Sequence, residues 1–128
     1  MIYIDSSVAL ARLLLEPRSA PERLWQERLV SSQLLEYEVW NRVHAYGLTS
    51  SIGNKAQALL LRIGMVEMTR SVLAKALEPL PISVRTLDSL HLATLDFLRR
   101  RGDVVELASY DDRLLAAAQA LGVPISPL

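Results

Sequence analysis

The chain of 128 residues contains no cysteine. This absence excludes a disulfide framework, thiolate metal sites and thiol nucleophiles, and it fits the reducing cytoplasm. No apolar run is long enough to span a bilayer, and the N-terminus lacks the basic flank and apolar stretch of a signal peptide. We therefore expect a cytoplasmic protein that makes no membrane contact and that is complete from its first strand onward.

Net charge is absent too, because 14 basic residues balance 14 acidic ones. This balance argues against non-specific attraction to nucleic acid or membranes. A nucleic-acid partner would have to be held by local basic patches or through a metal ion. Lysine is scarce, and Lys55 and Lys75 are the only two. The abundant arginine suits bidentate phosphate contacts, but genomic base composition is the simpler explanation for it.

Glycine-rich phosphate loops are missing, which argues against a P-loop or dinucleotide-binding protein. Ser6 and Ser7 lack the glycine-flanked elbow and the paired histidine of a serine hydrolase. A receiver-like phosphotransfer domain also places an aspartate after a strand, but it needs a late-strand lysine, and none follows Lys75. A haloacid-type phosphatase needs a second aspartate where Ser7 stands. Phosphotransfer is therefore the less favoured alternative.

The first seven residues combine a strand pattern, an aspartate and the start of a helix. Ile2 to Ile4 is typical of a strand buried on both faces, and Asp5 follows at once. Ser6 or Ser7 is a candidate N-cap for the apolar helix that runs from Ser7 to Leu15. Asp5 would thus lie at the carboxyl end of the first strand, where open α/β sheets bind ligands.

Strand and helix patterns alternate along the rest of the chain. Hydrophobic spacing and breaker residues predict helices over 20–28, 32–47, 49–64, 69–77, 83–101 and 113–121, and strands over 29–31, 65–68, 104–109 and 123–125. This alternation predicts one α/β domain, residues 1–128, with a parallel sheet of four or five short strands.

Carboxylates occur where this fold could bring them together. Asp5 and Asp111 follow strands, while Glu38 and Asp88 lie in the first turns of helices that should face the same edge. Four neighbouring carboxylates repel one another unless their pKa values rise or a cation enters. Magnesium and manganese prefer oxygen ligands. A metal that activates water and screens phosphate at such a site would cleave phosphodiesters.

Four segments resemble, in order, the four sequence blocks of PIN domains: 2–7, 32–39, 85–93 and 109–113. They are most similar to the VapC toxins of bacterial VapBC toxin–antitoxin pairs, and the resemblance covers nearly the whole chain. It implies a three-layer α/β/α domain. It also implies a magnesium-dependent endoribonuclease toxin of a type II pair, with Mn²⁺ as a substitute ion and transfer RNA as a family-level substrate.

The resemblance also implies roles for single residues. The acidic quartet would be Asp5, Glu38, Asp88 and Asp111; the metal ligands would be Asp5, Asp88 and Asp111, with Asp112 as an extra ligand. Ser7 would support Asp5 by a hydrogen bond. Arg85 and Arg113 are candidate contacts to RNA phosphates. Glu36 is the one rival of Glu38, and His91 is expected to be a packed histidine rather than a ligand.

The partners implied are a VapB-type antitoxin, the RNA substrate and a second copy of the chain. The antitoxin would wrap the toxin with a hydrophobic helix and place a basic residue among the carboxylates, forming a hetero-oligomer. We expect the homodimer to use the helical hairpin of residues 32–63. A non-catalytic interaction module, in which the acids bind a cation or a partner's arginine, is the alternative.

Overall fold

A computed structural model describes all residues from 1 to 128. Its central layer is a four-stranded sheet in the order β3-β2-β1-β4, and every neighbouring pair is parallel. The strands are β1 (Ile2–Ile4), β2 (Leu29–Ser32), β3 (Gly64–Val66) and β4 (Glu106–Ala108). The predicted parallel sheet is therefore confirmed.

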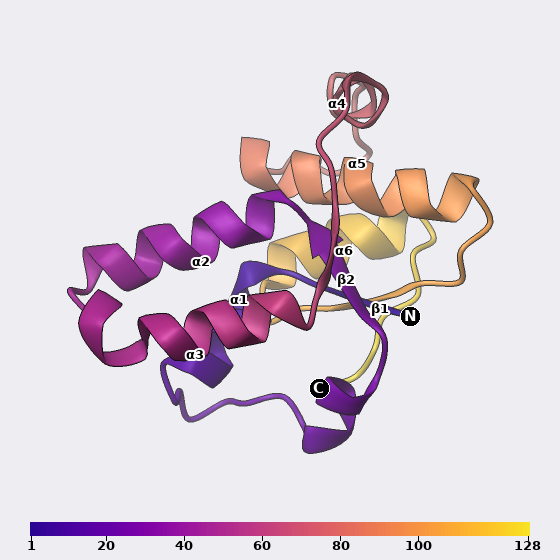
Figure 1. Cartoon of the computed structure of the whole chain (residues 1–128). Helices are drawn as coiled ribbons and strands as arrows, with labels where there is room; N and C mark the ends of the chain where they lie inside the picture. The colour runs from indigo at the N-terminus through magenta and orange to yellow at the C-terminus, as the bar shows by residue number, and fades with distance from the viewer.

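Helices cover both faces of this sheet (Figure 1). Helices α1 (Ser6–Leu13), α2 (Leu34–Ala45) and α3 (Thr49–Leu61) pack on one face, together with a 3₁₀ helix, η1 (Glu22–Gln26). Helices α5 (Thr86–Arg100) and α6 (Asp112–Ala120) pack on the other, and α4 (Arg70–Ala76) lies against α5. The fold is the three-layer α/β/α arrangement that was expected. None of its helices combines the length and apolarity needed to cross a membrane.

Alternation along β1 divides the core in two. Ile2 and Ile4 join the cluster under α1, α2 and α3, whereas Tyr3 joins the cluster under α5 and α6. Each such buried side chain contributes about 1.5–3 kcal/mol relative to its exposed state. Because the strand is buried on both faces, its position in the sheet is tightly determined, and so is the direction in which Asp5 leaves it.

The predicted fifth strand does not form. The segment 123–125 makes a single isolated bridge, between Leu107 and Ile125. Leu107 donates its N–H to the carbonyl of Pro124, and Ser126 donates to the carbonyl of Leu107. Pro124 has no N–H of its own, so the ladder cannot continue.

Two helical predictions also needed correction. The segment 20–28 forms only the short η1, because the chain must already be extended at Leu29 to enter β2. The N-cap position of α1 is occupied by Asp5, not by Ser6 or Ser7, and the Asp5 side chain makes no capping hydrogen bond. Its carboxylate is thereby free for other contacts.

Candidate active site

The carboxyl ends of β1 and β4 form the centre of the site. These strands are neighbours, with Ile4 opposite Ala108, while β2 and β3 continue the sheet on the other side of β1. The chain passes from β1 to β2 and β3 on one side and then returns to β4 on the other side of β1, and such a switch point is where α/β sheets bind ligands. Asp5 and Ser109 are the first residues beyond the two strand ends.

Asp5 is only 5% exposed and accepts two hydroxyl hydrogen bonds. Ser7 Oγ donates to Oδ1 at 2.6 Å, and Ser109 Oγ donates to Oδ2 at 2.8 Å. Burial raises the pKa of Asp5 above its ordinary value, and the charge of Glu38 adds to this rise, while the two hydroxyls oppose it. No ion pair reaches Asp5 in the structure.

The two serines also connect Asp5 to the β4–α6 turn. Ser7 Oγ accepts the N–H of Tyr110 at 2.9 Å, and Ser109 Oγ accepts the N–H of Asp111 at 2.9 Å. Asp111 caps α6, because its Oδ1 accepts the N–H groups of Arg113 and Leu114. The hydroxyl of Ser109 therefore connects the carboxylate of Asp5 to the backbone of Asp111.

Glu38 enters the site from α2, as its fifth residue rather than in its first turn. Ser6 Oγ donates to Oε2 of Glu38 at 3.2 Å, and His91 Nε2 lies 2.6 Å from Oε1. On its other side, His91 Nδ1 lies 2.6 Å from the hydroxyl of Tyr3, which accepts the N–H of Ser32. Burial raises the pKa of Tyr3 far above its usual range.

Asp88 lies in the first turn of α5, as expected, and is buried. The Arg85 guanidinium lies between Asp88 and Asp111, with Nε 3.6 Å from Oδ2 of Asp88 and Nη2 3.4 Å from Oδ2 of Asp111. The first distance is too long for a hydrogen bond, so the buried Oδ2 of Asp88 has no hydrogen-bond partner. Asp88 thus has a buried carboxylate oxygen of the kind that divalent cations prefer as a ligand.

Three of the four acids are linked through intermediaries rather than by direct contact. Ser109 joins the Asp5 carboxylate to the backbone N–H of Asp111, and Arg85 lies between the carboxylates of Asp111 and Asp88. Glu38 instead contacts Ser6 and His91. No three acidic or histidine side chains are close enough, as placed, to share one metal ion. An ion that used Asp88 and Asp111 together would have to take the place of the Arg85 guanidinium.

The remaining candidates lie outside this network. Asp112 and Arg113 are exposed at the start of α6, and their side chains form no ion pair. Glu36 is exposed and lines a different pocket, together with Trp40 and Gln57. Arg42, which could have paired with Glu38, instead lies over the ring of Tyr46.

Sequence comparison places the chain among known proteins. Residues 2–120 match the family described as PIN domain. The chain belongs to the PIN domain family. Among its relatives is the Ribonuclease VapC46 of Mycobacterium tuberculosis strain ATCC 25618 / H37Rv, with 33% identity over 97% of this chain and 95% of the relative. The Ribonuclease VapC47 of strain CDC 1551 / Oshkosh is 30% identical over 99% of this chain and 97% of its own length. This PIN domain is therefore of the VapC type.

Sequence reasoning missed Tyr3 and Ser109 as members of this PIN-domain site. Period-two alternation puts Tyr3 on the face of β1 opposite Ile2 and Ile4, which is a usable signal. Nothing in the sequence indicates that this face meets His91, because that contact joins residues 88 positions apart.

Proposed function

We propose that this chain is a magnesium-dependent endoribonuclease and the toxin of a type II toxin–antitoxin pair, in one domain of residues 1–128. Membership of the PIN domain family supports this, and so do relatives whose printed names are ribonucleases. The observation that carries it is Asp5, a carboxylate buried at the switch point of the sheet with no cationic partner. A buried charge of this kind favours the entry of a cation.

Asp5, Asp88 and Asp111 would hold the ion. Asp112, the first residue of α6, would be a further ligand at the same edge of the sheet. Their oxygens suit Mg²⁺, with Mn²⁺ as a substitute, and the unpartnered Oδ2 of Asp88 is an available donor. When bound, the ion supplies a Lewis acid that lowers the pKa of a water and screens phosphate charge. Ser7 supports Asp5 by donating its hydroxyl proton to Oδ1.

The other polar residues would handle the proton and the RNA. Glu38 would orient the attacking water and receive its proton, because its charge adds to the rise in the pKa of Asp5 and its carboxylate is held at this edge by Ser6 and His91. Arg85 is 69% exposed, so its guanidinium can leave the carboxylates and contact a phosphate. Arg113 lies at the same edge and would add a second phosphate contact. Transfer RNA is the substrate class that we propose.

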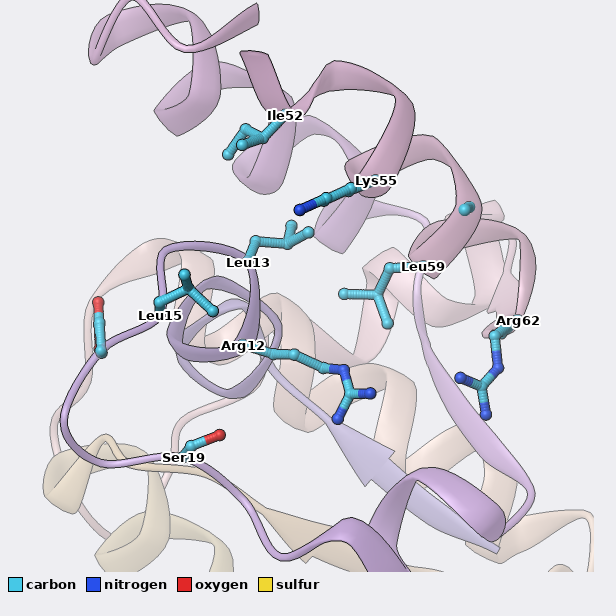
Figure 2. Close-up of a pocket in the computed structure, with 10 residues that line it drawn as sticks. Arg12, Leu13, Leu15, Ser19, Ile52, Lys55, Leu59 and Arg62 are labelled. Atoms are coloured by element: carbon cyan, nitrogen blue, oxygen red, sulfur yellow. The ribbon is translucent and has the colours of Figure 1, made fainter.

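A groove of about 690 Å³ on the α1–α3 face is the surface that we assign to the antitoxin. Figure 2 shows Leu13 and Leu59 between the cations Arg12 and Lys55, with Arg62 at one end. The groove has three cations against one lining acid, Glu16, although Arg12 also pairs with Glu22 outside it. Apolar side chains with this excess of positive charge suit an amphipathic segment that carries acidic residues. The groove contains none of the carboxylates of the quartet, so such a partner would need a further segment to reach them.

RNA cleavage by purified protein, freed of any partner, tests the proposal. Wild type is expected to cleave RNA with Mg²⁺ and to stop in excess EDTA. Glu38→Gln is expected to lower kcat by about 10²–10⁴-fold, because it removes the proton acceptor while keeping side-chain size.

The matched control is Glu36→Gln, an identical change on the same helix at an exposed position, which should retain wild-type cleavage. Cleavage that continues in chelator would exclude a metal mechanism. If carboxylate variants remained as toxic to cells as wild type, the protein would be a non-catalytic interaction module rather than an enzyme.

A further inference from the structure

His91 joins three elements at the edge of the site. It belongs to α5, is 2% exposed, and packs edge-on against the ring of Tyr3 in β1, with ring centroids 5.8 Å apart. Its far nitrogen reaches Glu38 of α2, which covers the opposite face of the sheet. One buried side chain therefore connects both helical layers at the point where Glu38 enters the site.

The hydrogen bonds around His91 determine where its proton lies. Oε1 of Glu38, a carboxylate oxygen, can only accept, so the proton of the 2.6 Å contact belongs to His91 Nε2. The Tyr3 oxygen already accepts the N–H of Ser32, and its own proton can be donated to Nδ1 across 2.6 Å. Donors and acceptors match along the whole series from Ser32 through Tyr3 and His91 to Glu38.

We propose that His91 is a positioning residue for Glu38, which it holds by Nε2–H while the Tyr3 hydroxyl holds Nδ1. The expected effect on RNA cleavage rests on the proposed ribonuclease function, whereas the hydrogen bonds of His91 do not depend on it. Glutamate has three rotatable side-chain bonds, and a free carboxylate would sample many positions. His91 on Oε1 and Ser6 on Oε2 restrict it to one, so the catalytic geometry exists before substrate arrives.

Asparagine and glutamine at position 91 separate positioning from packing. The glutamine amide nitrogen reaches about where Nε2 lies and can still donate to Glu38, whereas asparagine ends near Nδ1 and cannot. His91→Asn is expected to lower kcat by about 10–100-fold, the usual cost of losing an outer-shell partner. It should also lower Mn²⁺ affinity, measured by calorimetry, because Glu38 would accept a hydrogen bond from a water bound to the ion. His91→Gln should recover most of both, and KM for RNA should stay near wild type in each variant.

Two further variants complete the design. His44→Gln makes the same substitution on α2, at an exposed histidine stacked on Trp40, and should leave Mn²⁺ affinity and kcat unchanged. Tyr3→Phe should lower both quantities less than His91→Asn does. Added to His91→Asn, it should cause no further loss, because residues acting through one contact are not additive.

The outcomes separate this inference from the proposed function. If Asn and Gln at position 91 lose activity equally and in proportion to their melting temperatures, His91 only fills the core and the inference is wrong. If wild type cleaves no RNA but His91→Asn still weakens Mn²⁺ binding selectively, the ribonuclease proposal falls and the positioning role stands. Nitrogen-15 NMR of the metal-free protein gives an independent readout: a protonated Nε2 with a bare Nδ1 is expected, and a bare Nε2 would overturn the inference.

Discussion

Asp5 is a carboxylate that the fold buries without providing a cation. Its two hydroxyl partners, Ser7 and Ser109, oppose the rise in its pKa, but burial remains the largest influence on it. A charged group kept in such an environment costs folding free energy. Functional sites commonly retain groups that lower the stability of the fold, and interactions elsewhere in the protein offset this cost.

The first prediction concerns Asp5→Asn in metal-free protein. The substitution removes the buried charge, and both serine hydroxyls can reorient to the amide. At neutral pH in EDTA we expect the melting temperature to rise by about 2–5 °C, which corresponds to roughly 1 kcal/mol for a chain of this size. Differential scanning calorimetry measures it, while RNA cleavage by the same variant should be lost.

The sign of the pH dependence follows from the direction of the pKa shift. Because the folded-state pKa of Asp5 lies above its unfolded value, its stabilising contribution is complete below about pH 4 and is lost as pH rises through the folded pKa. Wild type and Asp5→Asn should therefore melt alike near pH 4 and separate above it. A constant difference from pH 4 to 8 would contradict this reading of Asp5.

The second prediction concerns Arg85→Gln. The guanidinium is mostly exposed, so its ion pairs with Asp88 and Asp111 are weak, and a metal ion can displace it. We expect Mn²⁺ affinity to rise about three- to tenfold, consistent with loss of about 1 kcal/mol of competition, and RNA affinity to fall. Arg113→Gln removes the same charge without an ion pair. Equal gains in Mn²⁺ affinity from both variants would show a long-range charge effect instead.

Single-residue positions could be predicted from the sequence only where a local rule applies. Asp5 and Asp111 follow strands, and the end of a parallel strand determines its edge of the sheet. Arg85 was recognised as a neighbour of the site, but its placement between Asp88 and Asp111 depends on the spacing of α5 and α6. That spacing is set by how α5 and α6 pack beside each other on one face of the sheet, which no local sequence pattern encodes.

Helix α6 gives the clearest case of an element built into the site. Asp111 caps it and also pairs with Arg85 beside Asp88, so one side chain stabilises the helix and belongs to the candidate site. Most helices were predicted to within a few residues, because glycine and the apolar period mark their ends. The length of η1 was overestimated, because Leu24 and Trp25 resemble part of a helical face. The chain must become extended before β2, so only a 3₁₀ helix of five residues forms.

The third prediction separates the two roles of Asp111. Asparagine caps a helix about as well as aspartate, whereas alanine costs about 1 kcal/mol. In EDTA we expect Asp111→Asn to melt within a degree or two of wild type and Asp111→Ala to melt about 3–5 °C lower. Both should bind Mn²⁺ more weakly. If asparagine destabilised as much as alanine, the capping role assigned to Asp111 would be wrong.

At the scale of the whole molecule, apolar side chains remain exposed on the α2–α3 hairpin. Leu61 is 81% exposed, and Tyr37 and Tyr46 are also largely exposed. Exposed apolar surface of this kind favours association. The parallel sheet and its layers were predictable from the alternation of strands and helices. Helical spacing also leaves Leu61 outside the buried set of Ala56, Leu59, Leu60 and Ile63, but it does not say what covers an exposed leucine.

The fourth prediction is a homodimer through this hairpin. Light scattering after size-exclusion chromatography should give twice the chain mass for wild type and the monomer mass for Leu61→Glu. Leu77→Glu is the matched control, because Leu77 is 88% exposed next to α4, outside the hairpin. A wild-type monomer, or dissociation caused by Leu77→Glu alone, would place the interface elsewhere or remove it.

The central claim is that the carboxylates at the ends of β1 and β4 and at the start of α5 together bind a divalent metal ion. Anomalous diffraction from crystals soaked in Mn²⁺ tests it most directly. We predict a manganese peak within about 2.0–2.4 Å of oxygens from Asp5, Asp88 and Asp111, with the Arg85 guanidinium displaced. A manganese peak at another surface, or none while Arg85 stays between Asp88 and Asp111, would contradict the account.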